Sequence, residues 1–152
     1  MLYIGTDHRG LKLKQQLVDF IKSLDIEIRD IGAFEYDKED DYNDYAEQVA
    51  KRVRTGVTNL GIILCGSGNG VAVVCNKHKD IRCSLAFNKE VAKQSKTHLA
   101  CNIIAIPADH VDFETAKEIV LEFLKNSFDN EERHERRLQK ILKLEITSEN
   151  LA

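Results

Sequence analysis

A glycine-rich loop contains the residues with the clearest capacity for chemistry. It begins at Cys65, directly after the most apolar run of the chain, and reads Cys-Gly-Ser-Gly-Asn-Gly as far as Gly70. Such a loop presents backbone N–H groups at the start of a helix, where unsatisfied donors and the helix dipole stabilise an anion. The same field favours the thiolate of Cys65, a base that can remove a proton alpha to a carbonyl. The N–H groups and the Ser67 hydroxyl would hold the developing enediolate oxygen, as an isomerase requires.

The loop also fits a purely structural interpretation, in which the glycines make a tight strand-to-helix turn and Cys65 packs in the core. Glycine spacing alone does not decide between the two. Nucleotide binding is a weaker alternative, because no Lys-Ser or Lys-Thr pair follows the loop and the dinucleotide-binding spacing is incomplete.

A second candidate group lies at the end of the first expected strand. Asp7 can hold sugar hydroxyls and His8 can bind oxyanions. Ligands of parallel sheets bind at the carboxyl ends of the strands, so both side chains are expected to face the Cys65 loop. Taken alone, Asp7 is more simply explained as a helix cap, since Asp is favoured there.

A basic segment near the end of the chain, residues 133–137, is a third candidate, and His98 is a fourth. Arg133 and Arg137 are four residues apart, so they share one helical face and two guanidiniums can grip a phosphate. A solvated basic face is the alternative. His98 is expected at the end of another helix, near the negative end of its dipole, where it would otherwise be an ordinary surface histidine.

Alternating strands and helices are expected to position these groups. Short apolar runs bounded by Gly, Asp, Asn or Pro predict five strands, at residues 2–5, 27–31, 60–65, 82–87 and 102–106. Amphipathic segments between them predict helices, and this alternation implies a mainly parallel sheet covered on both faces. A last helix, at about 130–146, has a basic face suited to docking on a neighbouring subunit, and loop 34–41 is acidic and expected to be mobile.

Composition predicts a single domain, residues 1–146, followed by a flexible tail at 147–152. The 152 residues are 43% hydrophobic and 31% charged, with a formal net charge of -3, which argues against a nucleic-acid partner. Neither a leader peptide nor a membrane-spanning run is evident, so a cytoplasmic location is expected. The four cysteines lack zinc-site spacing, and three are expected to be small core residues without disulfides.

Taken together, the motifs resemble the type B ribose-5-phosphate isomerase family, which includes the galactose-6-phosphate isomerase subunits. The resemblance covers residues 1 to about 142 and rests on Asp7-His8-x-Gly10, Asp41-Tyr42-x-Asp44-Tyr45-Ala46, Cys65-Gly-Ser-Gly-x-Gly70, Asn76-Lys77, Ile81-Arg82, His98 and Arg133-His134-x-x-Arg137. It implies a Rossmann-like three-layer α/β sandwich that forms homodimers or homotetramers with active sites shared between subunits. It also implies a small phosphorylated sugar as the ligand, and neither a metal nor an organic cofactor.

The resemblance also implies a role for each matching residue. Cys65 would shuttle a proton between C2 and C1, and the partner subunit's His98 would help to open the furanose ring. Ser67 and its neighbours would stabilise the enediolate. The further substrate contacts that we expect are Asp7, His8, Tyr42, Gly66, Gly68, Asn69 and Gly70 around the sugar, and His8, Arg133, His134 and Arg137 at the phosphate.

Three positions depart from the family pattern. Leu99-Ala100 follows His98 where the family usually has Asn-Asp, and Asn43 replaces a usual Pro. Asp109 stands where most members carry an Arg near the phosphate, and a carboxylate there is expected to repel a dianion. The default reaction is the interconversion of D-ribose 5-phosphate and D-ribulose 5-phosphate through a cis-enediolate. The alternatives are isomerisation of allose or galactose 6-phosphate, and sugar-phosphate binding without catalysis.

Overall fold

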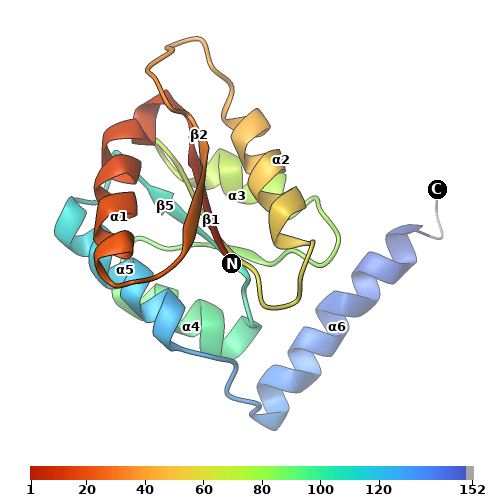
Figure 1. Ribbon diagram of the computed structural model, residues 1–152. Helices are drawn as coiled ribbons and strands as arrows, with labels where there is room; N and C mark the ends of the chain where they lie inside the picture. The colour runs from red at the N-terminus through yellow and green to blue at the C-terminus, as the bar shows by residue number, and fades with distance from the viewer. Residues whose placement is uncertain (150–152) are drawn as a thin grey trace.

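The computed structural model describes residues 1–149, which form a parallel sheet covered by helices (Figure 1). Every strand pair is parallel, and the strands lie in the order β2-β1-β3-β5-β4. Their bounds are β1 (Leu2–Thr6), β2 (Ile28–Gly32), β3 (Leu60–Cys65), β4 (Cys83–Leu85) and β5 (Ile103–Pro107). The predicted α/β class is confirmed, although β4 is shorter than the strand expected at residues 82–87.

The helices lie on the two faces of this sheet. The short 3₁₀ helix η1 is His8–Gly10, and the α-helices are α1 (Leu11–Ser23), α2 (Tyr42–Val53), α3 (Asn69–Cys75), α4 (Lys89–Leu99), α5 (Phe113–Lys125) and α6 (Glu132–Glu149). Helices α1, α4 and α5 cover one face, and α2 and α3 cover the other, so each face of the sheet has its own apolar cluster. This is the three-layer arrangement that the alternation of elements predicts.

Strand β3 shows how the sheet divides the core. Ile62 and Leu64 belong to the cluster under α1 and α5, whereas Ile63 and Cys65 belong to the cluster under α2 and α3. Successive side chains of a strand point to opposite faces, and a central strand buried on both faces is apolar throughout. Cys65 is therefore the last inward-facing residue of β3, on the α2 and α3 side.

Helix α6 stands apart from the rest of the chain, which it approaches mainly at α4 (Figure 1). It continues to Glu149, so the first three residues of the tail expected at 147–152 are helical. Residues 150–152 lie outside the described residues. In the part of the chain that the structure describes, none of the helices combines the length and apolar character needed to cross a membrane.

Candidate active site

The Cys65 loop folds back on the thiol that precedes it. The side chain of Cys65 is buried, and its Sγ accepts a hydrogen bond from the Gly68 N–H at 3.2 Å. Ser67 Oγ accepts a second one from the Asn69 N–H, also at 3.2 Å. The turn needs glycine at position 68, where φ is +74° and a Cβ would lie 2.4 Å from Leu85 Cδ1. The tight-turn interpretation and the chemical one therefore describe the same geometry.

A pocket of about 430 Å³ opens beside this thiol. Its lining comes from the segment after β1 with η1, from the end of β3 and the loop after it, from the starts of α2 and α3, and from the connection after β5: Asp7, Arg9, Tyr42, Cys65, Gly66, Ser67, Gly70 and Asp109. Tyr42, at the start of α2, lies directly against Gly70, where a Cβ would be only 2.5 Å from the Tyr42 ring. The structure thus brings most of the predicted sugar-binding residues together with Cys65, and it adds Arg9 and Asp109.

Asp7 is both a helix cap and a pocket residue. Its Oδ1 accepts a hydrogen bond from the Arg9 N–H at 3.0 Å, which caps η1. Its side chain is almost fully buried, and this burial raises the pKa of the carboxyl group against the opposing effect of the Arg9 N–H. The capping interpretation is therefore correct and does not exclude contact with a ligand.

The side chain of His8 contacts Asp40, a residue that the sequence patterns did not indicate. Its Nδ1 lies 2.5 Å from Asp40 Oδ1, and its backbone N–H donates to the same oxygen at 3.2 Å. The hydrogen bond to Asp40 raises the pKa of His8, so the cationic form persists to higher pH. Asp40 belongs to the acidic loop 34–41, in which no spacing or motif marks it as a site residue.

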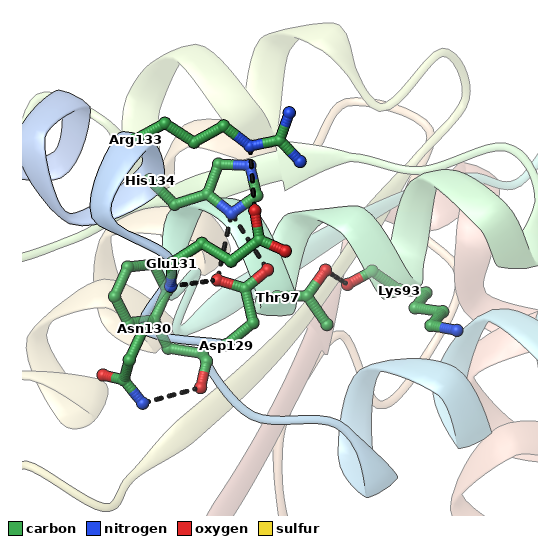
Figure 2. A network of polar contacts seen from close by, with 8 residues as sticks. Lys93, Thr97, Asp129, Asn130, Glu131, Arg133 and His134 are labelled. Atoms are coloured by element: carbon green, nitrogen blue, oxygen red, sulfur yellow. Dashed lines mark hydrogen bonds and ion pairs between the residues drawn. The ribbon is translucent and has the colours of Figure 1, made fainter.

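His98 lines a second pocket, of about 290 Å³, together with His134 and Arg137. His98, in the last turn of α4, stacks on His134 of α6 with ring centroids 4.1 Å apart. His134 is buried, and its Nδ1 lies 2.9 Å from both carboxylate oxygens of Asp129 (Figure 2). The pKa of Asp129 is lowered chiefly by the hydrogen bond that its carboxylate accepts from the Glu131 N–H, and secondly by the hydrogen bond with His134. Both interactions keep this carboxylate ionised.

The two arginines of α6 differ in their contacts. Arg133 Nε donates to Glu131 Oε2 at 2.9 Å, as Figure 2 shows. Arg137 lines the second pocket together with His98 and His134. Their four-residue spacing is as predicted, but within one chain only Arg137 accompanies the two histidines in a pocket.

Among residues 1–145, whose side chains the structure describes, the two pockets have no lining residue in common. The predicted site residues consequently fall into two groups: the Cys65 group with Asp7 and Tyr42, and the His98 group with His134 and Arg137. Each group also contains a carboxylate: Asp109, which the sequence singled out only as a departure from the family pattern, in the first, and Asp129, which it did not single out, in the second.

The other three cysteines agree with their predicted core role. Cys75, Cys83 and Cys101 are free and buried. Burial raises the pKa of Cys101 to about 11, so this group remains a thiol at neutral pH.

Two groups of three side chains have potential metal-ligating atoms within 4.8 Å of one another in the described chain: His98, Asp129 and His134, and Asp7, His8 and Asp40. In each group a carboxylate already engages a histidine Nδ1. The other carboxylate oxygen of Asp40, Oδ2, is buried without a hydrogen-bond partner among the described residues.

A model of the ribose/galactose isomerase family matches residues 2–141. This chain belongs to that family. The ribose-5-phosphate isomerase B of Mycobacterium tuberculosis is 34% identical over 148 residues, which cover 97% of this chain and 91% of the relative. The predicted family resemblance is confirmed over nearly the extent expected from the motifs.

Solved structures of relatives have the same fold. The crystal structure of ribose-5-phosphate isomerase B from Mycoplasma genitalium with bound ribulose-5-phosphate has a TM-score of 0.91 and 33% identity, and the match covers 95% of each chain. Ribose-5-phosphate isomerase B from Clostridium thermocellum has the same TM-score at 34% identity, covering 97% of this chain and 98% of that one. The likeness thus extends over the whole sandwich.

Proposed function

We propose that this chain is an aldose–ketose isomerase that interconverts D-ribose 5-phosphate and D-ribulose 5-phosphate. The observation that carries the proposal is the Cys65 thiol, held 3.2 Å from the Gly68 N–H at the edge of a pocket that Ser67 also lines. A base beside fixed hydrogen-bond donors is what enolisation next to a carbonyl requires. The relatives named ribose-5-phosphate isomerase B, one of them with bound ribulose-5-phosphate, support this substrate pair.

The reaction proceeds by proton transfer within one pocket. The Cys65 thiolate removes the C2 proton of the open-chain aldose, and the C2–H electron pair forms the C1–C2 double bond of a cis-enediolate. The loop N–H groups and Ser67 hold the negative oxygen that develops at C1. Cys65 then returns the proton to C1 while the hydroxyl proton on O2 moves to O1, so that C2 becomes the ketone carbonyl and C1 an alcohol carbon. Asp7 and Tyr42 bind sugar hydroxyls from the wall of the pocket.

His98 is assigned to the preceding step, the opening of the furanose ring. An imidazole can exchange a proton with the ring oxygen and the anomeric hydroxyl. Because His98 lines a pocket separate from Cys65, we assign it to the active site of a second copy, together with His134 and Arg137. One active site would then consist of the Cys65 pocket of one subunit and the His98 pocket of its partner.

The surface around α6 supports a homodimer. Ile141 and Leu144 are exposed on this helix, Leu144 by 70%, and they line a groove of about 450 Å³ with Leu99. A helix that stands off its own domain gains little stability from local interactions, so an apolar face favours packing against another chain. A second copy of this chain is the occupant that also completes the active site.

We also propose a cytoplasmic location. Cys65 acts as a base only while it is reduced, and all four cysteines are free. Reducing compartments maintain thiols in that state.

A hexose 6-phosphate is the second candidate substrate. Leu99 lines the His98 pocket with an apolar side chain, and a change from polar to apolar lining alters which sugar hydroxyls can be bound.

The experiment that tests the proposed function is an isomerase assay of the purified protein on D-ribose 5-phosphate, with D-allose 6-phosphate and D-galactose 6-phosphate in parallel. We expect the highest kcat/KM with the ribose ester. Preference for a hexose ester would make Leu99 a specificity determinant, and no turnover of any ester would favour sugar-phosphate binding without catalysis.

A further inference from the structure

An ion pair lies across the Cys65 loop. Arg9 donates two hydrogen bonds to Asp109 Oδ2, from Nε at 2.9 Å and from Nη2. The pair rests directly on Gly66, because a Cβ at that position would lie 2.5 Å from Arg9 Nε and 2.7 Å from Asp109 Oδ2. The Asp109 N–H also donates to the Gly66 carbonyl oxygen at 3.0 Å. The ion pair is therefore part of the wall beside the catalytic thiol.

The sheet order brings these two residues together from positions 100 residues apart. Arg9 follows β1 and Asp109 follows β5, and β1 and β5 are the two neighbours of β3. Since Gly66 directly follows β3, segments from both neighbouring strands meet above it. The contact depends on the order of the strands, so local sequence patterns do not reveal it.

Arg9 offsets the negative charges of the pocket lining. Asp7 and Asp109 contribute two carboxylates to the lining, and of the lining residues in the described chain only Arg9 carries a fixed positive charge. Carboxylates repel a phosphate dianion, whereas a guanidinium attracts it. The pKa of Arg9 is raised, chiefly by the hydrogen bond to Asp109, with smaller contributions from the charges of Asp7 and Cys65.

Arg9 retains the capacity to bind a ligand while it is paired. A guanidinium has five N–H donors, and Asp109 accepts from two of them, which leaves three. The side chain is 56% exposed, so these donors remain accessible from the pocket. Asp109 holds the guanidinium in one place, which lowers the entropy lost when an anion binds.

We propose that Arg9 binds the phosphate group of the substrate and that Asp109 positions its guanidinium. The inference rests on the proposed function and identifies the residue that selects phosphorylated sugars at the Cys65 pocket. It also accounts for Asp109, whose carboxylate by itself would repel the phosphate. In this chain Arg9 balances the charge of Asp109, and Asp109 orients the guanidinium of Arg9.

The test compares Arg9→Ala and Arg9→Lys with Lys51→Ala, which breaks an exposed ion pair of similar exposure, Glu47 with Lys51, on α2. We would measure kcat and KM for D-ribose 5-phosphate and the inhibition constant of inorganic phosphate. Arg9→Ala should raise both KM and the inhibition constant about tenfold to hundredfold, because charge-assisted hydrogen bonds to the phosphate are lost, while kcat stays within about threefold. Arg9→Lys should give an intermediate effect, since it keeps the charge but loses the fork of donors. Lys51→Ala should match the wild type.

Asp109→Asn sharpens the test, because it removes the charge but keeps an oxygen that can accept from Arg9. This variant should bind inorganic phosphate severalfold more tightly than the wild type. An unchanged inhibition constant in Arg9→Ala would overturn the proposal, and so would a fall in kcat without a change in KM. Calorimetric binding of inorganic phosphate to the wild type and Arg9→Ala tests the same contact without turnover, so it separates failure of this inference from failure of the proposed reaction.

Discussion

The Cys65 pocket and the His98 pocket are built in different ways. The Cys65 pocket forms where the carboxyl ends of adjacent central strands meet, and a backbone N–H of the same loop contacts its thiol. The His98 pocket forms between the end of α4 and a helix that stands off the body (Figure 1), and side-chain contacts fix its imidazoles. The first pocket depends on the sheet and on the helices packed against it, whereas the second depends on how α6 is held. Substitutions in the first pocket should therefore act through chemistry, whereas those in the second should act through assembly and orientation as well.

The largest effect should come from Cys65→Ala. Removing the base should lower kcat by about a thousandfold or more, while binding of D-ribose 5-phosphate, measured by calorimetry, stays within a few fold. Cys101→Ala is the matched control, because it truncates another buried cysteine whose raised pKa keeps it a thiol. Equal loss of binding and turnover in Cys65→Ala, or equal loss of turnover in both variants, would contradict the assignment of Cys65 as the base.

His98→Asn should reduce kcat/KM by about a hundredfold, because ring opening loses its acid–base group. If the two pockets meet across a dimer, this variant and Cys65→Ala should complement each other. A mixed dimer then has one active site with both substitutions and one with neither. Coexpressed and purified mixed dimers should recover about half of the wild-type activity, because one of the two sites in a C₂ dimer is restored. Activity no higher than that of the two separate variants would show that a single chain supplies both residues.

A smaller effect is expected from Asp129→Asn, which tests how the His98 pocket is held. The amide no longer favours the Nδ1–H form of His134, so kcat/KM should fall by about tenfold. Asp19→Asn, which changes an exposed residue of α1, is the control.

The same variant tests how stability depends on pH. The contacts that lower the pKa of Asp129 stabilise the fold at pH values above the ordinary carboxyl pKa, and this stability is lost as the pH falls through the lowered pKa. The difference in Tm between wild type and Asp129→Asn should accordingly shrink in acid, and a difference independent of pH would contradict this explanation.

The sequence predicts the sheet and the Cys65 loop well because both depend on local patterns. Uninterrupted apolar runs mark strands buried on both faces, and the glycines after β3 mark a turn that needs a positive φ at Gly68. The order of the strands and the contacts that depend on it are not local. Arg9 with Asp109 and His8 with Asp40 join residues 100 and 32 positions apart, so periodicity and spacing carry no signal for them.

The His98 pocket also contains contacts that the sequence does not predict. The sequence places His98 at a helix end and Arg137 on a helical face, as observed. It does not predict that His98 stacks on His134, nor that Asp129 bonds that histidine, because both contacts depend on the packing of α6 against α4. Residue types suggested the right chemistry, and tertiary packing determined which residues act together.

The smallest effect should come from Asp40→Asn, and it appears in the pH dependence. Asp40 raises the pKa of His8, so in the wild type the imidazolium persists as the pH rises above the ordinary histidine range. If His8 contacts the phosphate, KM should increase as the pH rises through this raised pKa, because the positive charge is lost. In Asp40→Asn the same increase should begin at lower pH, with KM a few fold higher than wild type near neutrality. Asp37→Asn, the same change in the same loop, should leave the profile where it is. Identical KM profiles for Asp40→Asn and the wild type would mean that the charge of His8 does not act on the substrate.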